Sequence, residues 1–218
     1  MKPKLALNRL EATITEYEKY PVIKGKILLY GSSFFAKWGY ERSQQMMSGY
    51  GGEEIATVNH GFGGSTGEEQ LYYYGRMVRP YEPRMIVLRG GVNDLSKGYS
   101  PEEAAMFSIR VLEWARTDFP GIRLVPMAAF DYRSAPASRI FTLLHQYNRL
   151  MKQYAEENPN TWYLDISPFF YKKAEDVGTF AGFRDDVFGP DGLHLTDHGY
   201  EMFKDYFKAE LAKIDADR

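Results

Sequence analysis

Short, continuous apolar runs recur along the chain with longer, helix-like stretches between them, and this rhythm constrains the fold most strongly. Such runs are typical of strands that are buried on both faces of a parallel sheet. The alternation predicts a three-layer α/β/α sandwich with a five-stranded parallel sheet in the flavodoxin-like order 2-1-3-4-5. The expected strands are Lys26–Tyr30, Ile55–Asn59, Met85–Arg89, Ile122–Ala128 and Trp162–Ile166. The expected helices are Phe35–Met47, Glu68–Val78, Pro101–Asp118, Ser138–Glu157 and Thr196–Ile214.

The length of 218 residues favours one domain over residues 1–218, because most domains hold roughly 100–200 residues. Two parts depart from the β-α rhythm: an N-terminal helical extension over about residues 1–22 and a loop insertion over about 168–190. Long loops within a compact domain tend to be functional, so we expect the aromatic residues of the insertion to line a pocket. These aromatic residues are Phe169, Phe170, Tyr171, Phe180, Phe183 and Phe188.

Composition excludes several classes of protein. Lys and Arg number 27 against 29 Asp and Glu, a net charge of −2, which argues against a nucleic-acid partner. There is no apolar run near the ~20 residues that cross a bilayer, and no signal-like segment begins the chain, so we expect no membrane span and a cytoplasmic location. Without any cysteine, covalent chemistry would have to use Ser, Thr, Lys or a carboxylate.

Four polar or glycine-rich turns follow predicted strands or precede the last helix. Ser33 lies just after the first strand, where a hydroxyl at the start of a helix can act as a nucleophile. Four glycines within Gly61–Gly67 follow the second strand, and Asn93 follows the third. Asp191 precedes His194 by three residues, a spacing that lets the carboxylate orient an imidazole base. In the order 2-1-3 the first three turns adjoin, and the long 168–190 segment can bring His194 to them.

These blocks, in this order, resemble the SGNH or GDSL-type serine hydrolases, especially their bacterial esterases. The resemblance covers most of the chain and is carried by YGSSFFAKW, NHGFGGST, GGVND and DGLHLTDHGY. Ser32 stands where the family's usual Gly-Asp-Ser has Asp, which leaves the position of the nucleophile unchanged.

The resemblance implies a role for each of the marked residues. Ser33 would be the nucleophile, His194 the general base and Asp191 the residue that orients it. The N–H groups of Ser33 and Gly64 and the side-chain amide of Asn93 would form the oxyanion hole. The implied reaction is hydrolysis of a carboxylic ester through an acyl-enzyme, with no metal or organic cofactor. The expected partner is a small ester, such as an acylated sugar or lipid, and the short chain favours a small acyl group.

Two alternatives use other residues for chemistry. Gly63–Gly67 matches G-x-S-x-G, the nucleophile elbow of α/β-hydrolases, and Ser65, Asp165 and His194 follow in the matching order. That fold normally builds more than two strands before its elbow, which argues against Ser65. His194, Asp197 and His198 could instead bind a divalent metal, although the Glu of H-E-x-x-H is missing.

A third alternative is a non-catalytic module on the same fold that binds carbohydrate or another small molecule. Its stacking surfaces would come from Trp38, Tyr72, Tyr73, Tyr74 and the 168–190 insertion. Asp131–Pro136, after the fourth strand, could line an acyl pocket or stack on a sugar.

Overall fold

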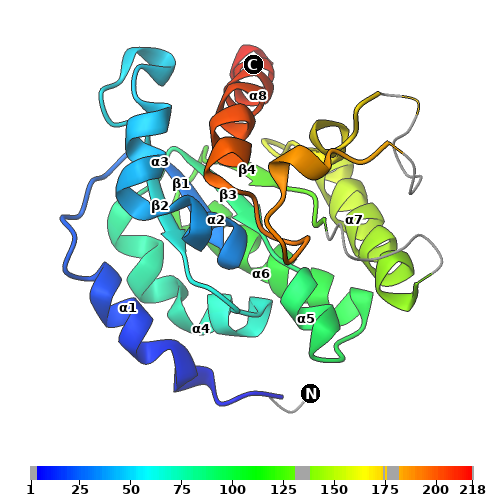
Figure 1. Ribbon diagram of the computed structural model, residues 1–218. Coiled ribbons are helices and arrows are strands. Elements are labelled where there is room, and N and C mark those ends of the chain that lie inside the picture. The colour runs from blue at the N-terminus through cyan, green and yellow to red at the C-terminus, as the bar shows by residue number, and fades with distance from the viewer. Residues whose placement is uncertain (1–3, 131–137, 174, 176–181, 218) are drawn as a thin grey trace.

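The core of the protein is a parallel sheet of four strands in the order β2-β1-β3-β4 (Figure 1). The computed structural model describes residues 4–130, 138–173, 175 and 182–217. All three strand pairs are parallel, and β1 lies between β2 and β3, with Gly31 opposite both Gly61 and Arg89. The strands are β1 (Ile27–Gly31), β2 (Thr57–Gly61), β3 (Met85–Arg89) and β4 (Arg123–Pro126).

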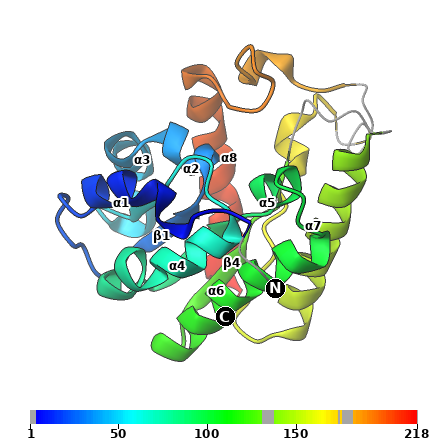
Figure 2. The same cartoon turned by 90° about the horizontal axis from the view of Figure 1, so that it is seen from below.

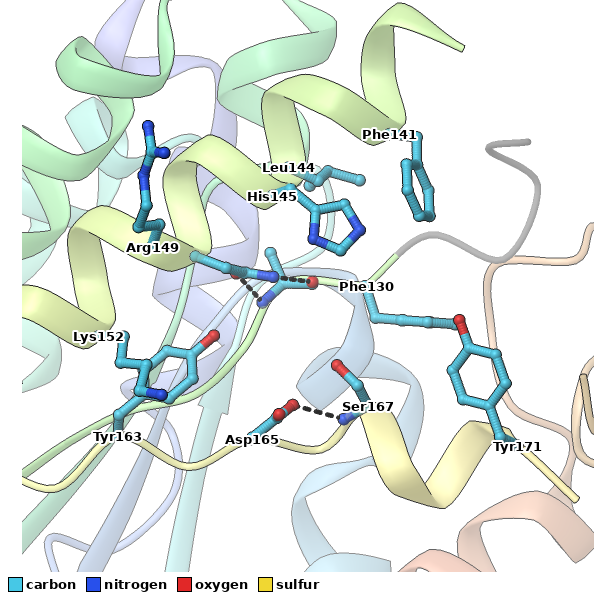
Figure 3. A pocket seen from close by; sticks show the side chains of 12 residues that line it. Phe130, Phe141, Leu144, His145, Arg149, Lys152, Tyr163, Asp165, Ser167 and Tyr171 are labelled. Atoms are coloured by element: carbon cyan, nitrogen blue, oxygen red, sulfur yellow. Dashed lines mark hydrogen bonds between the residues drawn. The ribbon is translucent and has the colours of Figure 1, made fainter. Parts of the chain in front are cut away.

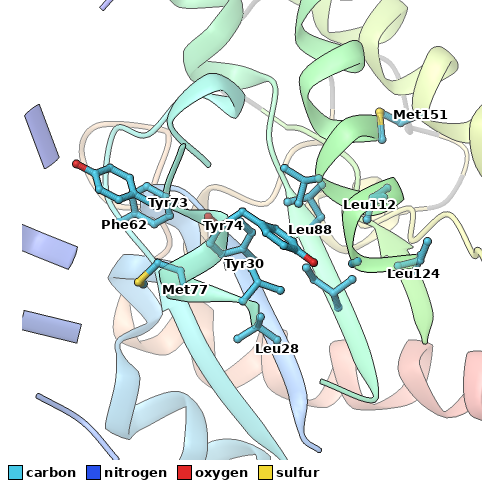
Figure 4. Packing of buried hydrophobic residues seen from close by; sticks show 14 of the residues in the cluster. Leu28, Tyr30, Phe62, Tyr73, Tyr74, Met77, Leu88, Leu112, Leu124 and Met151 are labelled. Carbon is cyan, nitrogen blue, oxygen red and sulfur yellow. The ribbon is translucent and has the colours of Figure 1, made fainter. Parts of the chain in front are cut away.

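The strands are buried on both faces, so the sheet separates two apolar layers. Along β1, Leu28 and Tyr30 belong to one buried cluster, while Ile27 and Leu29 belong to the other, as the two-residue period of a strand requires. The first cluster packs against α4, α6 and α7 and is drawn in Figure 4. The second packs against α2, α3 and α8. This arrangement, visible also from below in Figure 2, confirms the predicted three-layer α/β/α sandwich.

The helices follow the sequence signals closely where caps are strong. The helix α6 begins and ends as predicted, because Ser100 and Glu103 form a capping box and Pro101 occupies the first turn. The predicted helix over 35–47 is split at Gly39, whose φ of 81° cannot continue a helix. The helices are α1 (Glu11–Tyr17), α2 (Ser33–Trp38), α3 (Tyr40–Met47), α4 (Gly67–Met77), α5 (Val92–Ser96), α6 (Pro101–Asp118), α7 (Arg139–Glu157) and α8 (Asp197–Ala216).

The fifth strand predicted from the sequence does not form as a continuous strand. The segment predicted as Trp162–Ile166 does run parallel to β4, but it makes only the isolated bridges Leu124–Thr161 and Met127–Leu164. Its N–H groups still bond to β4, since Trp162 donates to the Leu124 carbonyl and Leu164 to that of Pro126, both at 2.9 Å. It therefore occupies the position of a fifth strand without forming a continuous one. No helix among the described residues is both long and apolar enough to cross a membrane.

His60 on β2 gives the fold a pH dependence. Burial lowers its pKa from 6.5 to about 4, and its Nδ1 donates to the Met77 carbonyl at 2.6 Å. The unfolded chain binds a proton below pH 6.5, whereas the folded chain does so only near pH 4. The free energy of unfolding should therefore fall as the pH drops through this window, by up to about 3 kcal/mol from this residue.

Urea unfolding of the wild type and of His60→Asn at several pH values measures this contribution. Asn keeps a donor near the position of Nδ1 but does not titrate. We expect the difference in unfolding free energy between the two proteins to shrink as the pH falls from 6.5 to 4. A difference that stays constant over this range would contradict the prediction.

Candidate active site

Ser33 is the first residue of α2 and lies two residues after the end of β1. The turn is tight because a Cβ on Gly31 would lie 2.6 Å from the Arg89 carbonyl oxygen of β3. As the first helical residue, Ser33 has an N–H with no acceptor inside the helix. Its side chain is partly exposed, unlike that of Ser32 beside it. The structure thus places the predicted nucleophile at the carboxyl edge of the sheet.

The glycine-rich loop after β2 packs directly on α2. A Cβ on Gly61 would lie 2.3 Å from the Ala36 nitrogen, so only glycine permits this approach. A Cβ on Gly63 would lie 4.0 Å from Cβ of Ser33. Gly64 follows with a φ of 75°, and among the described residues its N–H has no acceptor. The structure therefore brings the Gly64 loop beside Ser33, as the strand order predicted.

Asn93 lies in the first turn of α5, a short helix that the sequence did not predict. Its Nδ2 donates to the Ser65 carbonyl at 2.9 Å, which ties the loop after β3 to the glycine-rich loop. One amide hydrogen of Asn93 is used in this bond, and the second has no acceptor among the described residues. The turns after β1, β2 and β3 therefore form one cluster that can present several N–H donors together.

Two buried carboxylates beneath the cluster were not singled out from the sequence. Asp94 accepts from the Gly67 N–H at 2.9 Å, and Glu69 accepts from the Thr66 N–H at 3.0 Å. Burial, with a smaller contribution from the charge of Glu69, raises the pKa of Asp94 to about 7 against the opposing effect of bonds from backbone N–H groups. Thr66 and Glu69 form a capping box, a pattern that sequence reasoning could have found.

Asp191 and His194 form the predicted pair. Oδ2 of Asp191 accepts from Nδ1 of His194 at 2.6 Å, and Oδ1 accepts from the backbone N–H groups of Leu193 and His194, each at 3.0 Å. Bonds from the His194 N–H, the His194 ring and the Leu193 N–H lower the pKa of Asp191 well below its usual range. The carboxylate is thus held ionised and fixes the tautomer of the imidazole, with the proton on Nδ1.

The other ring nitrogen of His194 faces the protein interior without a bond. Nε2 is shielded from solvent and has no hydrogen-bond partner in the part of the chain that the structure describes. With Nδ1 protonated, Nε2 carries a lone pair that can accept a proton. A general base must come within hydrogen-bond reach of the proton that it takes, and Nε2 is the nitrogen of His194 that is free to make such a bond.

Packing ties the start of α8 to the Ser33 turn. Tyr200 donates through its hydroxyl to the Phe34 carbonyl at 2.6 Å, and the rings of the two residues lie 5.8 Å apart. Figure 1 shows the orange segment before α8 passing close to α2. Among the described residues no hydrogen bond joins the Ser33 hydroxyl to His194. The structure brings the two segments together, and catalytic bonds often tighten only when substrate binds.

The structure does not favour the two alternative chemistries, with Ser65 as the nucleophile or with a metal bound near His194. Ser65 is 2% exposed, and its hydroxyl is engaged with the Gly31 carbonyl and the Gln70 amide. Asp165 accepts from the Ser167 N–H, while His194 is paired with Asp191 instead. Over residues 4–130, 138–173, 175 and 182–217, no three His, Asp or Glu side chains cluster as metal ligands would.

The aromatic stacking surface expected for a binding module is largely absent. Trp38, Tyr73 and Tyr74 are buried in the core, and only Tyr72 of that set is exposed. Four aromatic residues of the insertion, Phe169, Phe170, Phe183 and Phe188, are likewise buried and belong to the apolar cluster on one face of the sheet. The expectation that these rings line a pocket is therefore wrong for these four, because they form an apolar layer under the loop. Phe180 lies outside the described residues.

A pocket of about 290 Å³ opens beside this layer, between the end of β4, α7 and residues 163–171 (Figure 3). Its lining includes the apolar side chains of Phe130, Leu144 and Tyr171, and Asp165 and Ser167 lie across the pocket from Leu144 on α7. The guanidinium of Arg89 links it to the Ser33 turn, since Arg89 donates to the Phe130 carbonyl at 3.1 Å and lies 4.5 Å above the Phe34 ring. Asp131–Pro136, expected to line such a pocket, lies outside the described residues.

Comparison with known proteins identifies the family and agrees with the fold. The model of the GDSL-like lipase/acylhydrolase family matches residues 29–202, and the chain belongs to that family. No curated protein sequence matches it significantly.

Solved structures share the fold at low identity. A candidate platelet activating factor from Streptococcus pneumoniae aligns with a TM-score of 0.74 and 19% identity over 94% of each chain. A GDSL-like lipase from Bacteroides thetaiotaomicron aligns with a TM-score of 0.70 and 14% identity, over 95% of this chain and 99% of that one. A catalytic mutant of an acetylxylan esterase from Geobacillus stearothermophilus aligns with a TM-score of 0.66 and 17% identity, over 88% of this chain and 96% of that one.

Proposed function

We propose that the chain is a serine esterase that hydrolyses carboxylic esters through Ser33, His194 and Asp191. The observation that carries the proposal is His194: its Nδ1 is bonded to an ionised Asp191, and its buried Nε2 has no partner among the described residues. Membership of the GDSL-like lipase/acylhydrolase family supports the same reaction class.

In the first step the Ser33 Oγ attacks the ester carbonyl carbon while Nε2 of His194 takes the hydroxyl proton. The carbonyl π bond opens to an oxyanion, which then re-forms the carbonyl as the alcohol leaves, and His194 gives its proton to the departing oxygen. Water then attacks the acyl-enzyme with the roles reversed, and the carboxylic acid leaves. Asp191 stabilises the imidazolium at each stage and keeps its own charge.

The oxyanion would lie among three donors: the N–H groups of Ser33 and Gly64 and the free amide hydrogen of Asn93. Each is fixed by the fold before substrate binds, Ser33 by α2 and Asn93 by its bond to the Ser65 carbonyl. Such preorganised donors cost no reorganisation at the moment of reaction, and each contributes about 3–4 kcal/mol to kcat in other serine hydrolases.

The substrate we propose is a small-acyl ester, with an acetylated sugar as the leading candidate. The pocket beside Phe130 is small and lined by both aromatic and polar groups, which suits a compact alcohol such as a sugar better than a long alkyl chain. The similarity in fold to an acetylxylan esterase supports this choice of substrate. A cytoplasmic location remains a sequence-based prediction.

Hydrolysis rates across an acyl series test the substrate class. We expect kcat/KM to be highest for acetyl and propionyl esters and to fall at least about tenfold by octanoyl, because each poorly accommodated methylene costs binding energy. Acetylated xylo-oligosaccharides and lysophospholipids belong in the same panel. A preference for long acyl chains or lysophospholipids would contradict the proposed substrate, while leaving the serine mechanism intact.

A further inference from the structure

Several side chains bond to the backbone of the glycine-rich loop, Gly61–Gly67, and most of them lie within the region that the family model matches. Asn93 binds the Ser65 carbonyl, Glu69 binds the Thr66 N–H, and Asp94 binds the Gly67 N–H. Gly64, in contrast, is bonded from outside that region. Its carbonyl accepts from Arg9 at 2.6 Å, and Arg9 lies outside the matched residues 29–202.

The guanidinium of Arg9 binds both the backbone of Gly64 and the carboxylate of Glu69. Nη2 donates both to the Gly64 carbonyl and to Oε2 of Glu69 at 2.8 Å, and Nε lies 2.7 Å from Oε1 of the same carboxylate. The Glu69 side chain is completely buried, so its charge needs a close cation. A lysine at this position could not span both acceptors with one planar group.

Two bonds hold the peptide between Gly64 and Ser65. The Ser65 N–H donates to the Phe62 carbonyl at 3.2 Å, which closes a turn over Gly63 and Gly64, and the Gly64 carbonyl accepts from Arg9 at 2.6 Å. Glycine at a φ of 75° has access to several other conformations at little cost. Among the described residues, neither Gly63 nor the Gly64 N–H makes a hydrogen bond of its own, so Arg9 supplies the side-chain contact that fixes Gly64 within this turn beside Ser33.

The segment that carries Arg9 lies across the loops at this edge of the sheet. Tyr17 of α1 donates to the Gly61 carbonyl, and the backbone N–H of Lys4 donates to the Tyr99 hydroxyl at 3.1 Å. Arg76 of α4 pairs with Glu11 and Glu18, each at 2.7 Å. The N-terminal segment is thus docked independently of Arg9, which lets the role of Arg9 be separated from docking.

We propose that Arg9 is a positioning residue for the oxyanion hole: it holds Gly64 so that the Gly64 N–H faces the oxygen of the substrate carbonyl. The inference rests on the proposed esterase function. It assigns to the N-terminal segment a part in the reaction, acting through the backbone of Gly64 and without touching substrate.

Arg9→Met tests this, with Arg76→Met as the matched control. Arg76 also anchors the N-terminal segment but makes no bond to the glycine-rich loop. We expect Arg9→Met to lower kcat at least about tenfold with KM within about threefold, since a misplaced donor acts on the transition state more than on substrate binding. Arg9→Lys should recover part of kcat, and Arg76→Met should keep kcat within about threefold. Equal losses in the two Met variants would overturn the proposal.

Amide hydrogen exchange over residues 61–67 measures how firmly Arg9 fixes the glycine-rich loop, and it does so independently of enzyme activity. We expect faster exchange there in Arg9→Met than in the wild type or Arg76→Met, and unchanged exchange would overturn the proposal. If Arg9→Met does not fold because Glu69 is left unpaired, Arg9→Met with Glu69→Gln removes the buried charge and gives the same readouts. An inactive wild type would overturn the esterase function, while exchange would still decide whether Arg9 holds the loop.

Discussion

Replacement of Ser33 by Ala should lower kcat for ester hydrolysis by roughly 10⁵-fold, with the fold unchanged. The Ser33 hydroxyl makes no hydrogen bond among the described residues, and its position at the first turn of α2 requires no hydroxyl for capping. The change removes the atom that would form the acyl-enzyme, and loss of the nucleophile alone costs serine hydrolases nearly all of the triad's contribution. Initial-rate kinetics with an acetyl ester, with circular dichroism to verify folding, measure the effect.

Ser65→Ala is the matched control, because it tests the competing nucleophile with the same chemical change. Ser65 is buried and its hydroxyl bridges the Gly31 carbonyl and Gln70, so its loss should reduce stability by about 1–2 kcal/mol and activity only modestly. A fluorophosphonate probe should label the wild type and Ser65→Ala but not Ser33→Ala. An active Ser33→Ala beside a dead Ser65→Ala would reverse the assignment.

The layers of the fold could be predicted because they follow from local signals. Met85–Leu88 is a continuous apolar run, and Ser100 to Glu103 carries a complete capping box, so strand β3 and helix α6 have the bounds expected. The fifth strand failed because continuous pairing depends on how the chain after α7 meets β4, which an apolar run does not encode. The same holds for α5, whose five residues are too few to show a helical period.

The candidate site was predictable only where strand order or short spacing in the sequence brings residues together. The adjacency of Ser33, Gly64 and Asn93 follows from strand order, and the Asp191–His194 bond follows from their spacing. Arg9 could not be found this way, since it lies 55 residues before Gly64 and its partner Glu69 looks like an ordinary helix-cap residue. The prediction that the aromatic residues of the insertion line a pocket was wrong for four of them for a related reason. Sequence alone does not distinguish rings that face a cavity from rings that fill the core.

Replacement of Asp191 by Asn should lower kcat by about 10³- to 10⁴-fold while the loop keeps its shape. Asn can still accept at Oδ1 from the backbone N–H groups of Leu193 and His194, which define the turn. Its amide, however, would present a donor to Nδ1 of His194. The ring would then adopt the tautomer with the proton on Nε2, which cannot accept the proton of Ser33.

The pH dependence separates this explanation from simple loss of charge. Backbone N–H groups and the His194 ring lower the pKa of Asp191, so in the wild type this carboxylate stays ionised as the pH falls through the range in which an ordinary Asp protonates. Its protonation should therefore add no acid limb to kcat/KM above pH 4. If the wrong tautomer causes the defect in Asp191→Asn, raising the pH should restore part of the rate through hydroxide-assisted attack, whereas Ser33→Ala should show no such recovery. Wild-type kcat in Asp191→Asn would show that another group orients His194.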